Sequence, residues 1–257
     1  MGKIIAVANQ KGGVGKTTTA VNMVAALTKR GRKILLIDCD PQGNATTGMG
    51  VKKNKGKGVY DVLLRDIPAS DAITETKYGD MITSRADLAG ANVEMVNLEN
   101  REYLLKQKLE TIRGKYDYIW IDCPPSLELL TLNALTAADT VFIPVQCEFY
   151  ALEGLSDLTN TIKLVKMRKN PALEIEGLAL TMYDTRTKLS TDVETALRKY
   201  FPGKVYKTTI PRNVRLSEAP SHGKPCISYD KSSKGSRAYL HLANEFLKNQ
   251  KGEKADG

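Results

Sequence analysis

The 257-residue sequence predicts an α/β protein whose doubly wound, mostly parallel sheet forms a single domain. Five short apolar runs are continuous rather than alternating, which is typical of strands buried on both faces of a parallel sheet. Stretches with helical periodicity separate these runs, and such alternation favours strand–helix–strand units. With 42% hydrophobic residues, the chain can bury one large core. We therefore expect one domain over residues 1–249 and a polar, disordered tail over residues 250–257.

The expected strands and helices alternate along the chain. The apolar runs lie at Ile4–Ala8, Ile34–Ile37, Tyr118–Ile121, Val141–Val145 and Leu178–Thr181. The helical patterns lie at Lys16–Lys29, Val93–Ile112, Leu152–Met167, Thr191–Tyr200 and Ser236–Lys248. In sheets of this kind, ligands bind beyond the carboxyl ends of the strands. Polar residues that directly follow the apolar runs are therefore the first candidates for a functional site.

Composition and local patterns exclude several classes of protein. The sequence lacks an apolar run of about 18 residues, so no transmembrane helix is expected. The first apolar stretch is too short for a signal peptide, and Ala6 replaces the Ser or Thr of a myristoylation site. The four cysteines are scattered without a C-x-x-C pair, which predicts small buried residues rather than a disulfide framework. We expect a cytoplasmic protein.

A glycine-rich stretch, N-Q-K-G-G-V-G-K-T-T-T at 9–19, follows the first run and opens the first helix. Strand, loop and helix in this order are the context of a phosphate-binding loop. Its glycines let backbone N–H groups surround phosphate oxygens at the positive end of the helix. Lys16 is expected to bridge the terminal phosphates, Thr17 to ligate Mg²⁺, and Thr18 to contact the alpha-phosphate. The loop departs from G-x-x-x-x-G-K-[ST], because Gln10 replaces the first glycine and a second lysine, Lys11, is present.

Carboxylates follow two of the other apolar runs. Asp38 and Asp40 come after the second run, and Asp122 directly follows the third. A carboxylate at a strand end beside a phosphate loop can hold Mg²⁺ through water. That role fits Asp122, with Asp38 in support. Asp40 is expected to orient or deprotonate an attacking water.

The positive charge is concentrated in the last third of the chain. The net charge is +9, and residues 186–237 contain twelve Lys and Arg against four Asp and Glu. A basic face of this kind indicates a polyanionic partner, either nucleic acid or an acidic membrane surface.

Three motifs occur together: K-G-G-V-G-K-T-T at 11–18, D-C-D-P-Q-G-N at 38–44 and D-C-P-P-S at 122–126. They resemble the deviant Walker A ATPases of the ParA/MinD group. The stretches at 144–155, 180–190 and 210–225 are similar to the short chromosomal ParA proteins known as Soj. The resemblance implies a P-loop fold and a Mg²⁺-dependent ATPase that is weak without a partner. Residues 181–184, T-M-Y-D, lack the Asn and Lys of the guanine-binding N-K-x-D pattern, which favours adenine.

The resemblance assigns the extra lysine, Lys11, to a second subunit. In this family that lysine reaches the nucleotide of a neighbour, so that two ATP molecules lie between two protomers. Lys16 would then contact phosphate within its own subunit, and Gly12 would lie at the subunit contact. A cation that faces another subunit's triphosphate favours association only when that charge is present.

The resemblance also implies which residues surround the nucleotide. Lys11, Lys16 and Asp40 are the implied catalytic residues, and Asp40 holds the attacking water. Pro211 to Asn213 line the adenine pocket, and Glu148 contacts the ribose side across the dimer. The implied metal ligands are Thr17, Asp38 and Asp122. The implied nucleotide-binding residues are Lys11, Gly12, Gly13, Val14, Gly15, Lys16, Thr17, Thr18, Glu148, Met182, Pro211, Arg212 and Asn213.

The same resemblance implies the partners. The ATP-bound homodimer would bind double-stranded DNA without sequence preference, and a ParB-type centromere-binding protein would stimulate hydrolysis. This function, in chromosome or plasmid partition, implies a nucleoid-associated protein with no membrane contact. The implied DNA-binding residues are Arg186 and Arg215, with Lys188, Lys224, Lys234 and Arg237 in support.

Two alternatives share the predicted fold. A MinD-like regulator of division placement would need an amphipathic C-terminal helix that docks on acidic lipid. Ser236–Lys248 has an apolar side, but its polar side is mixed in charge, and the apolar side could pack on the core. An iron–sulfur reductase would need cysteines at a subunit interface. Cys123 and Cys147 lie in motifs that do not suit that role.

Overall fold

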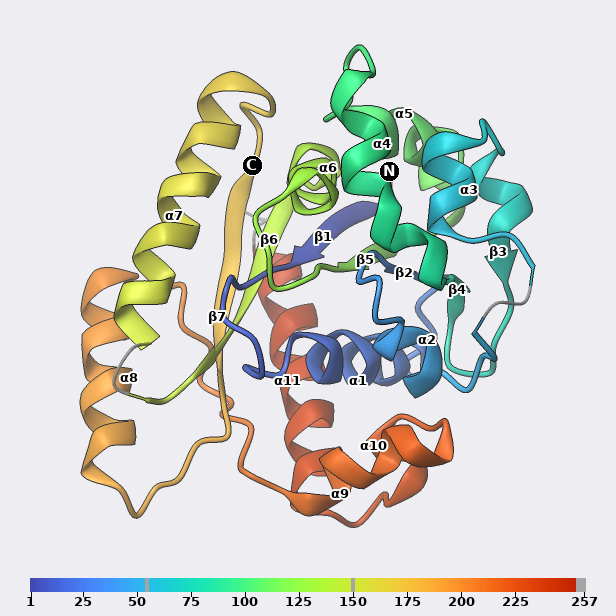
Figure 1. Cartoon of the computed structure of the whole chain (residues 1–257). Helices are drawn as coiled ribbons and strands as arrows, with labels where there is room; N and C mark the ends of the chain where they lie inside the picture. The colour runs from blue at the N-terminus through green and yellow to red at the C-terminus, as the bar shows by residue number, and fades with distance from the viewer. Residues whose placement is uncertain (54–55, 149–150, 253–257) are drawn as a thin grey trace.

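The computed structural model describes residues 1–53, 56–148 and 151–252, and it contains one sheet between two layers of helices (Figure 1). The seven strands of the described residues run in the spatial order β3-β4-β2-β5-β1-β6-β7. All neighbouring pairs are parallel except β3 with β4. The predicted doubly wound, mostly parallel fold is confirmed. The strands are β1 (Lys3–Val7), β2 (Ile34–Asp38), β3 (Ile73–Thr74), β4 (Asp80–Ile82), β5 (Tyr118–Asp122), β6 (Thr140–Gln146) and β7 (Glu174–Thr181).

Helices cover both faces of this sheet (Figure 1). Within the described ranges, no helix is long and apolar enough to cross a membrane. The α-helices are α1 (Lys16–Thr28), α2 (Asn44–Gly48), α3 (Val59–Leu64), α4 (Ala91–Glu94), α5 (Leu104–Glu110), α6 (Leu129–Ala137), α7 (Ala151–Arg168), α8 (Lys188–Tyr200), α9 (Val214–Glu218), α10 (Cys226–Tyr229) and α11 (Lys234–Gly252).

Alternate side chains of the central strands point to opposite faces of the sheet, and both faces are buried. Ile5 and Val7 of β1 belong to the core that includes α1 and α11. Ile4 and Ala6 belong to the core on the other face, which includes α5, α6 and α7. All four side chains are fully buried. Burial on both faces is the reason that these strands appear as continuous apolar runs in the sequence.

The C-terminal helix α11 is held on the sheet by aromatic contacts and by one buried hydrogen bond. The ring centroid of Phe246 lies 5.5 Å from that of Trp120 and 5.2 Å from that of Tyr118. The hydroxyl of Tyr239 lies 3.0 Å from the hydroxyl of Thr19 in α1. The apolar side of α11 is therefore part of the core, and α1 lies between α11 and α2.

One predicted helix, Val93–Ile112, is wrong, because α4 and α5 divide this segment. Asn100 has a left-handed backbone with φ 52°, which a continuous helix does not allow. The side-chain amide of Asn133 in α6 stabilises the non-helical segment between α4 and α5. It donates to the carbonyl of Arg101 at 2.7 Å and accepts from the N–H of Leu105 at 3.1 Å. Contacts from a distant helix thus override the local helical pattern.

The C-terminal boundary also differs from the prediction, because α11 continues to Gly252. Gln250, expected in the tail, is buried. Its amide donates to Glu176 at 2.6 Å, and its carbonyl oxygen accepts from Lys3 at 2.7 Å. The predicted boundary at 249 therefore lies inside α11, while 253–257 lie outside the described residues. The short strands β3 and β4 were not predicted, since two or three residues are too few to form a recognisable run.

The packing of β7 generates a stability prediction at Gly177. A Cβ at this position would lie 2.6 Å from the ring of Tyr206 and 3.0 Å from the carbonyl oxygen of Lys204. We expect Gly177→Ala to lower the free energy of unfolding by about 1–3 kcal/mol, because the segment that covers the outer edge of β7 must move. Urea unfolding followed by the fluorescence of Trp120, the single tryptophan, measures the change.

Gly154→Ala in α7 is the matched control. A Cβ at Gly154 would meet no atom within 4 Å, so this variant is expected to be more stable by about 0.5–1 kcal/mol. Unchanged stability of the Gly177 variant would contradict the prediction.

Candidate nucleotide-binding site

The glycine-rich loop leaves β1 and is pinned to two other strands before it enters α1. Gly13 and Gly15 adopt φ angles of 76° and 88°, a left-handed backbone that favours glycine. The hydroxyl of Thr181, at the end of β7, donates to the carbonyl of Val14 at 2.8 Å. The amide of Asn9 donates to the carbonyl of residue 144 in β6 at 2.8 Å and accepts from the N–H of residue 11 at 3.0 Å. The strand ends thus shape the loop.

The two lysines of the loop differ in burial and in partners. Lys16 is only 7% exposed, and its Nζ donates to the carbonyl oxygen of Lys11 at 3.0 Å. Burial lowers the pKa of Lys16, and the charge of Asp122 acts in the opposite direction. The side chain of Lys11 is 36% exposed and forms an ion pair with Glu148, so the two implied nucleotide contacts lie together. The loop therefore places Lys16 inside the site and Lys11 at its surface.

Gly12, Gly13, Thr17 and Thr18, which are also implied to bind nucleotide, are exposed or half-buried. Gly12 and Gly13 are exposed, and a Cβ on either would meet no atom of this chain within 4 Å. The subunit contact expected at Gly12 stays a prediction. Thr17 and Thr18 are half-buried in the first turn of α1. They line a pocket of 340 Å³ whose other lining residues are Val21, Asn22, Asn44, Thr47, Gly48, Leu216, Ala219, Pro220, Ser221, Lys224 and Cys226.

Two carboxylates meet beside the loop because β2 and β5 are parallel neighbours. Asp38 and Asp122 end these strands and are register partners, and both are fully buried. Burial raises the pKa of Asp38 to about 6. Burial, followed by the charge of Asp38, also raises the pKa of Asp122 well above its ordinary value. The site thus buries two neighbouring carboxyl groups, and burial disfavours the charged form of each.

These carboxylates differ in their hydrogen bonds. One oxygen of Asp38 accepts from the backbone N–H and the hydroxyl of Thr46, both at 2.7 Å. Neither oxygen of Asp122 has a hydrogen-bond partner among the described residues. The hydroxyl of Thr17 lies close enough to lower the pKa of Asp122, but it does not reach hydrogen-bond geometry.

The donor set fits a magnesium ion. A buried carboxylate without a donor is compensated most directly by a cation, so Asp122 and the neighbouring Thr17 are the residues that would hold Mg²⁺. Asp38 is engaged by Thr46 and suits a supporting position. Across residues 1–53, 56–148 and 151–252, no three His, Cys, Asp or Glu side chains could hold a metal by themselves. Mg²⁺ in nucleotide sites does not require such a group, because phosphates and water supply most of its ligands.

Asp40 lies next to this pair and is also buried, at 8% exposed. Its backbone N–H donates to Asp38 at 3.3 Å, and its carboxylate accepts from the N–H of Gln42 at 2.9 Å. The charge of Asp40 acts on the pKa of Lys16, so its carboxylate lies near the phosphate loop. Its role toward an attacking water stays a prediction.

The residues implied for the adenine pocket are brought together at the end of β7. Met182 has a left-handed backbone with φ 49°, which is uncommon for a residue with a side chain. Tyr183 and Pro211 form an isolated parallel bridge, and the N–H of Tyr183 donates to the carbonyl of Ile210 at 3.0 Å. The side chain of Asn213 accepts from the N–H of residue 215 at 3.2 Å, which caps α9. These contacts place the loop 211–213 beside the end of β7, next to Met182, and the adenine pocket expected there stays a prediction.

All six residues predicted to contact DNA are exposed, and they form two groups. One group lies at the connection from β7 to α8, and the other lies around α9, α10 and α11, both along the lower edge of Figure 1. Arg186 has an 86% exposed side chain and an ion pair with Asp184 at 2.7 Å. This arginine lowers the pKa of Asp184 to about 2. The groups are Arg186 with Lys188, and Arg215 with Lys224, Lys234 and Arg237.

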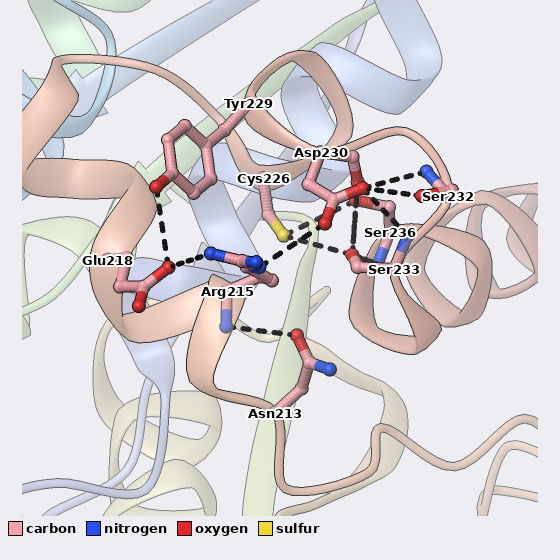
Figure 2. Close-up of polar contacts among 9 residues, drawn as sticks. All are labelled: Asn213, Arg215, Glu218, Cys226, Tyr229, Asp230, Ser232, Ser233 and Ser236. Carbon is pink, nitrogen blue, oxygen red and sulfur yellow. Dashed lines mark hydrogen bonds and ion pairs between the residues drawn. The ribbon is translucent and has the colours of Figure 1, made fainter.

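Figure 2 shows that Arg215 lies between two carboxylates. Its Nη1 donates to Glu218 at 2.8 Å, and its Nε lies 3.3 Å from an oxygen of Asp230. Asp184, outside the stretch of excess charge, pairs with Arg186 in a similar way. Both leading arginines thus have acidic partners, and of these partners only Asp184 lies outside the residues counted above.

The cysteines are free within the described ranges, as expected. Cys39, Cys123 and Cys226 are buried, which confirms the prediction for three of them, while Cys147 is half-buried. Sequence reasoning missed Asn9, Thr46 and Thr181, because their roles depend on strands that are distant in the chain. No local pattern marks them.

The carboxylate of Asp122, which has no hydrogen-bond partner among the described residues, generates a second prediction. In nucleotide-free, Mg²⁺-free protein, we expect Asp122→Asn to raise the free energy of unfolding by about 1–3 kcal/mol at about pH 7.5, because it relieves the repulsion between two adjacent buried carboxylates and removes a buried charge that has no hydrogen bond. In the wild type, Asp38 binds its proton up to about pH 6 when folded, against an ordinary pKa of 3.8. The folded state then binds more protons than the unfolded chain, so stability falls as the pH rises across this range.

Urea unfolding at about pH 5 and about pH 7.5 measures both effects, and the variant should show a smaller fall in stability than the wild type. Asp71→Asn, whose side chain is 49% exposed, is the control and should change little. A destabilised Asp122→Asn at the higher pH would contradict the prediction.

Comparison with known proteins agrees with this geometry. Residues 2–175 match the AAA domain family. The chain is 57% identical to the sporulation initiation inhibitor protein Soj of Bacillus subtilis, over 97% of this chain and 100% of that one. It is 53% identical to the chromosome partitioning protein ParA of Myxococcus xanthus, over 96% and 89%. Among solved structures, cobyrinic acid a,c-diamide synthase from Mycobacterium smegmatis with bound ADP and magnesium has a TM-score of 0.86, 40% identity and 98% and 96% coverage. The chain belongs to the ParA/MinD family of P-loop ATPases, in the group that contains the Soj and ParA proteins.

Proposed function

We propose that this protein is a DNA-partition ATPase that forms an ATP-dependent sandwich dimer on DNA. The observation that carries the proposal is the unequal placement of two lysines on one phosphate loop. Lys16 is buried beside Asp122, where it serves the nucleotide of its own subunit. Lys11 lies at the surface of the loop, where it can reach the triphosphate of a second subunit.

ATP and Mg²⁺ would be held by elements of the strand ends. The loop N–H groups and the positive end of α1 bind phosphate oxygens, and Lys16 neutralises the terminal phosphates. Asp122 and Thr17 would hold Mg²⁺, and the ion would supply positive charge beside the phosphates. Asp40 orients the attacking water. The left-handed Met182 and the loop 211–213 border the base.

Dimerisation requires Lys11 to exchange its partner. In the single chain the ammonium group of Lys11 pairs with Glu148, and both side chains are about one-third exposed. An exposed ion pair of this kind contributes only about 0–1 kcal/mol, so a triphosphate can replace the carboxylate at low cost. Glu148 is then available to the ribose side of the bound nucleotide. ATP thereby becomes part of the subunit interface.

Non-specific DNA binding would come from the two basic groups, one at the connection from β7 to α8 and one around α9, α10 and α11. Each contact with a phosphate changes the slope of log K against log salt by about 0.9. A dimer doubles the number of contacts, so it binds DNA tightly under conditions where one subunit hardly binds. The nucleotide thus controls DNA affinity through the number of subunits.

The names of the relatives support a role in partition, since they include a chromosome partitioning protein and Soj. In such a role, a ParB-type centromere-binding protein would stimulate hydrolysis, and the protein would reside in the cytoplasm on the nucleoid. The MinD-like alternative is less well supported, because the apolar side of α11 is buried against Trp120 and Tyr118. Co-sedimentation with liposomes or with plasmid DNA, in the presence of ATP, separates the two functions.

Two variants should separate nucleotide binding from hydrolysis. Lys16→Ala should abolish ATP-dependent dimerisation, because it removes the buried cation beside the terminal phosphates. Asp40→Ala should still dimerise and bind DNA with ATP, while hydrolysis falls by about 10²-fold or more. Light scattering and phosphate release measure these properties. Normal hydrolysis by the Asp40 variant would refute its role toward water.

The basic groups generate a further prediction. Arg186→Ala and Arg215→Ala should each weaken DNA binding by the ATP-bound dimer and reduce the salt slope by about 0.9 for each DNA phosphate that the arginine binds in the wild type. Binding is measured on a random-sequence duplex with ATP, with ADP and without nucleotide. Lys166→Ala, a basic residue of α7 paired with Glu174, is the control and should leave DNA binding unchanged. DNA binding that does not depend on nucleotide would refute the proposed switch.

A further inference from the structure

Asn22 of α1 connects the nucleotide site to the C-terminal basic segment. Asn22 is only 3% exposed, and both ends of its side-chain amide are used. Its Nδ2 donates to the carbonyl of Thr18 at 2.9 Å, and its Oδ1 accepts from the N–H of Cys226 at 2.8 Å. Thr18 lies in the first turn after the phosphate loop, whereas Cys226 begins α10. One buried side chain therefore joins two segments that are 204 residues apart in sequence.

Contacts continue from Cys226 to Arg215 (Figure 2). The Sγ of Cys226 lies 3.3 Å from the hydroxyl oxygen of Ser236, and that hydroxyl donates to the carbonyl of Asp230 at 2.6 Å. The carboxylate of Asp230 accepts from two backbone N–H groups that follow it, at 3.0 and 3.1 Å. The position of Asp230 is thus set by α10 and by the start of α11.

The position of Asp230 influences the orientation of the Arg215 guanidinium group, because the two side chains form an ion pair. Nη1 of the guanidinium group donates to Glu218 at 2.8 Å, Nε forms an ion pair with Asp230 at 3.3 Å, and the side chain is 48% exposed. Nη2 has no acceptor among the residues that the structure describes. The guanidinium group is planar, so one hydrogen bond and one ion pair together favour an orientation in which its remaining N–H groups point away from both carboxylates.

We propose that Asn22 is a positioning residue for Arg215 and thereby couples the phosphate-loop helix to DNA binding. The inference rests on the proposed function, because it requires Arg215 to contact DNA phosphate. The amide nitrogen of Asn22 donates to the first turn of α1, and its amide oxygen accepts from the first residue of α10. A change in that turn on nucleotide binding is transmitted through Asn22 and Asp230 to the guanidinium group. DNA affinity then depends on the nucleotide within each subunit, in addition to the number of subunits.

Removal of the Asn22 side chain should not unfold the region. The hydroxyls of Thr19 and Tyr239 still link α1 to α11, and the apolar contacts of Phe246 with the sheet remain. The effect of Asn22→Ala is therefore expected on the placement of α10 rather than on the fold.

A double-mutant cycle tests the proposal on the full chain. Asn22→Ala, Arg215→Ala and the double variant are compared with the wild type for binding to a random-sequence DNA duplex, with a non-hydrolysable ATP analogue and Mg²⁺. We expect Asn22→Ala alone to weaken DNA binding by about fivefold or more. In the Arg215→Ala background the same change should alter binding by less than about twofold. Nucleotide affinity and dimerisation should stay within about twofold of the wild type.

Asn170→Ala is the matched control. Asn170 is 5% exposed and donates to the carbonyls of Leu135 and Ala138, far from α10. This variant should become less stable while its DNA affinity stays unchanged. If Asn22→Ala does not fold, Cys226→Ala replaces it in the cycle, because it keeps the Asn22 contacts but removes the sulfur that faces Ser236.

The outcomes are distinct. An equal fall in DNA affinity from Asn22→Ala in both backgrounds, or a parallel fall in nucleotide affinity, would overturn the positioning role while leaving the proposed function intact. Unchanged DNA binding by Arg215→Ala itself would refute the DNA contact in the proposed function, and the inference with it.

Discussion

The parallel pairing of β2 with β5 places Asp38 opposite Asp122, and the site is organised around these two buried carboxylates. Like charges in a region of low dielectric repel strongly, so the surrounding chain has to compensate them. Thr46 compensates Asp38 with two hydrogen bonds, and Lys16 lies near Asp122. Asp122 nevertheless lacks a hydrogen-bond donor among the described residues, which is an unfavourable arrangement that a bound cation relieves.

Helix α1 links this chemistry to the rest of the molecule. Its first turn belongs to the phosphate loop, while its buried residues Thr19 and Asn22 bond to α11 and to α10. The C-terminal segment therefore packs on the same helix that would bind ATP. Under the proposed function, this arrangement provides a physical route from the nucleotide site to the basic surface, because the phosphate loop and the C-terminal segment both contact α1.

Acidic residues neutralise part of the positive charge around Arg186 and Arg215. Asp184 pairs with Arg186, while Glu218 and Asp230 hold Arg215. Under the proposed function, a DNA phosphate that binds Arg186 or Arg215 would have to compete with a carboxylate, so each of these two contacts would contribute little by itself. Affinity would then depend on how many contacts form together, as the proposed control by dimerisation requires. The carboxylates also fix the orientation of groups that would otherwise be mobile.

The sequence by itself determined five of the seven described strands, the phosphate loop and the strand-end carboxylates, because continuous apolar runs and the glycine loop are local patterns. It was wrong for Val93–Ile112, where Asn133 of a distant helix stabilises a break. It also did not reveal Thr46, Thr181 or Asn22, whose partners lie on other elements. Only the tertiary structure decided that Asp122 has no hydrogen-bond donor among the described residues, that Arg215 pairs with two carboxylates, and that α11 buries its apolar side. Burial and hydrogen bonding depend on neighbours that are distant in sequence, so the local pattern does not contain them.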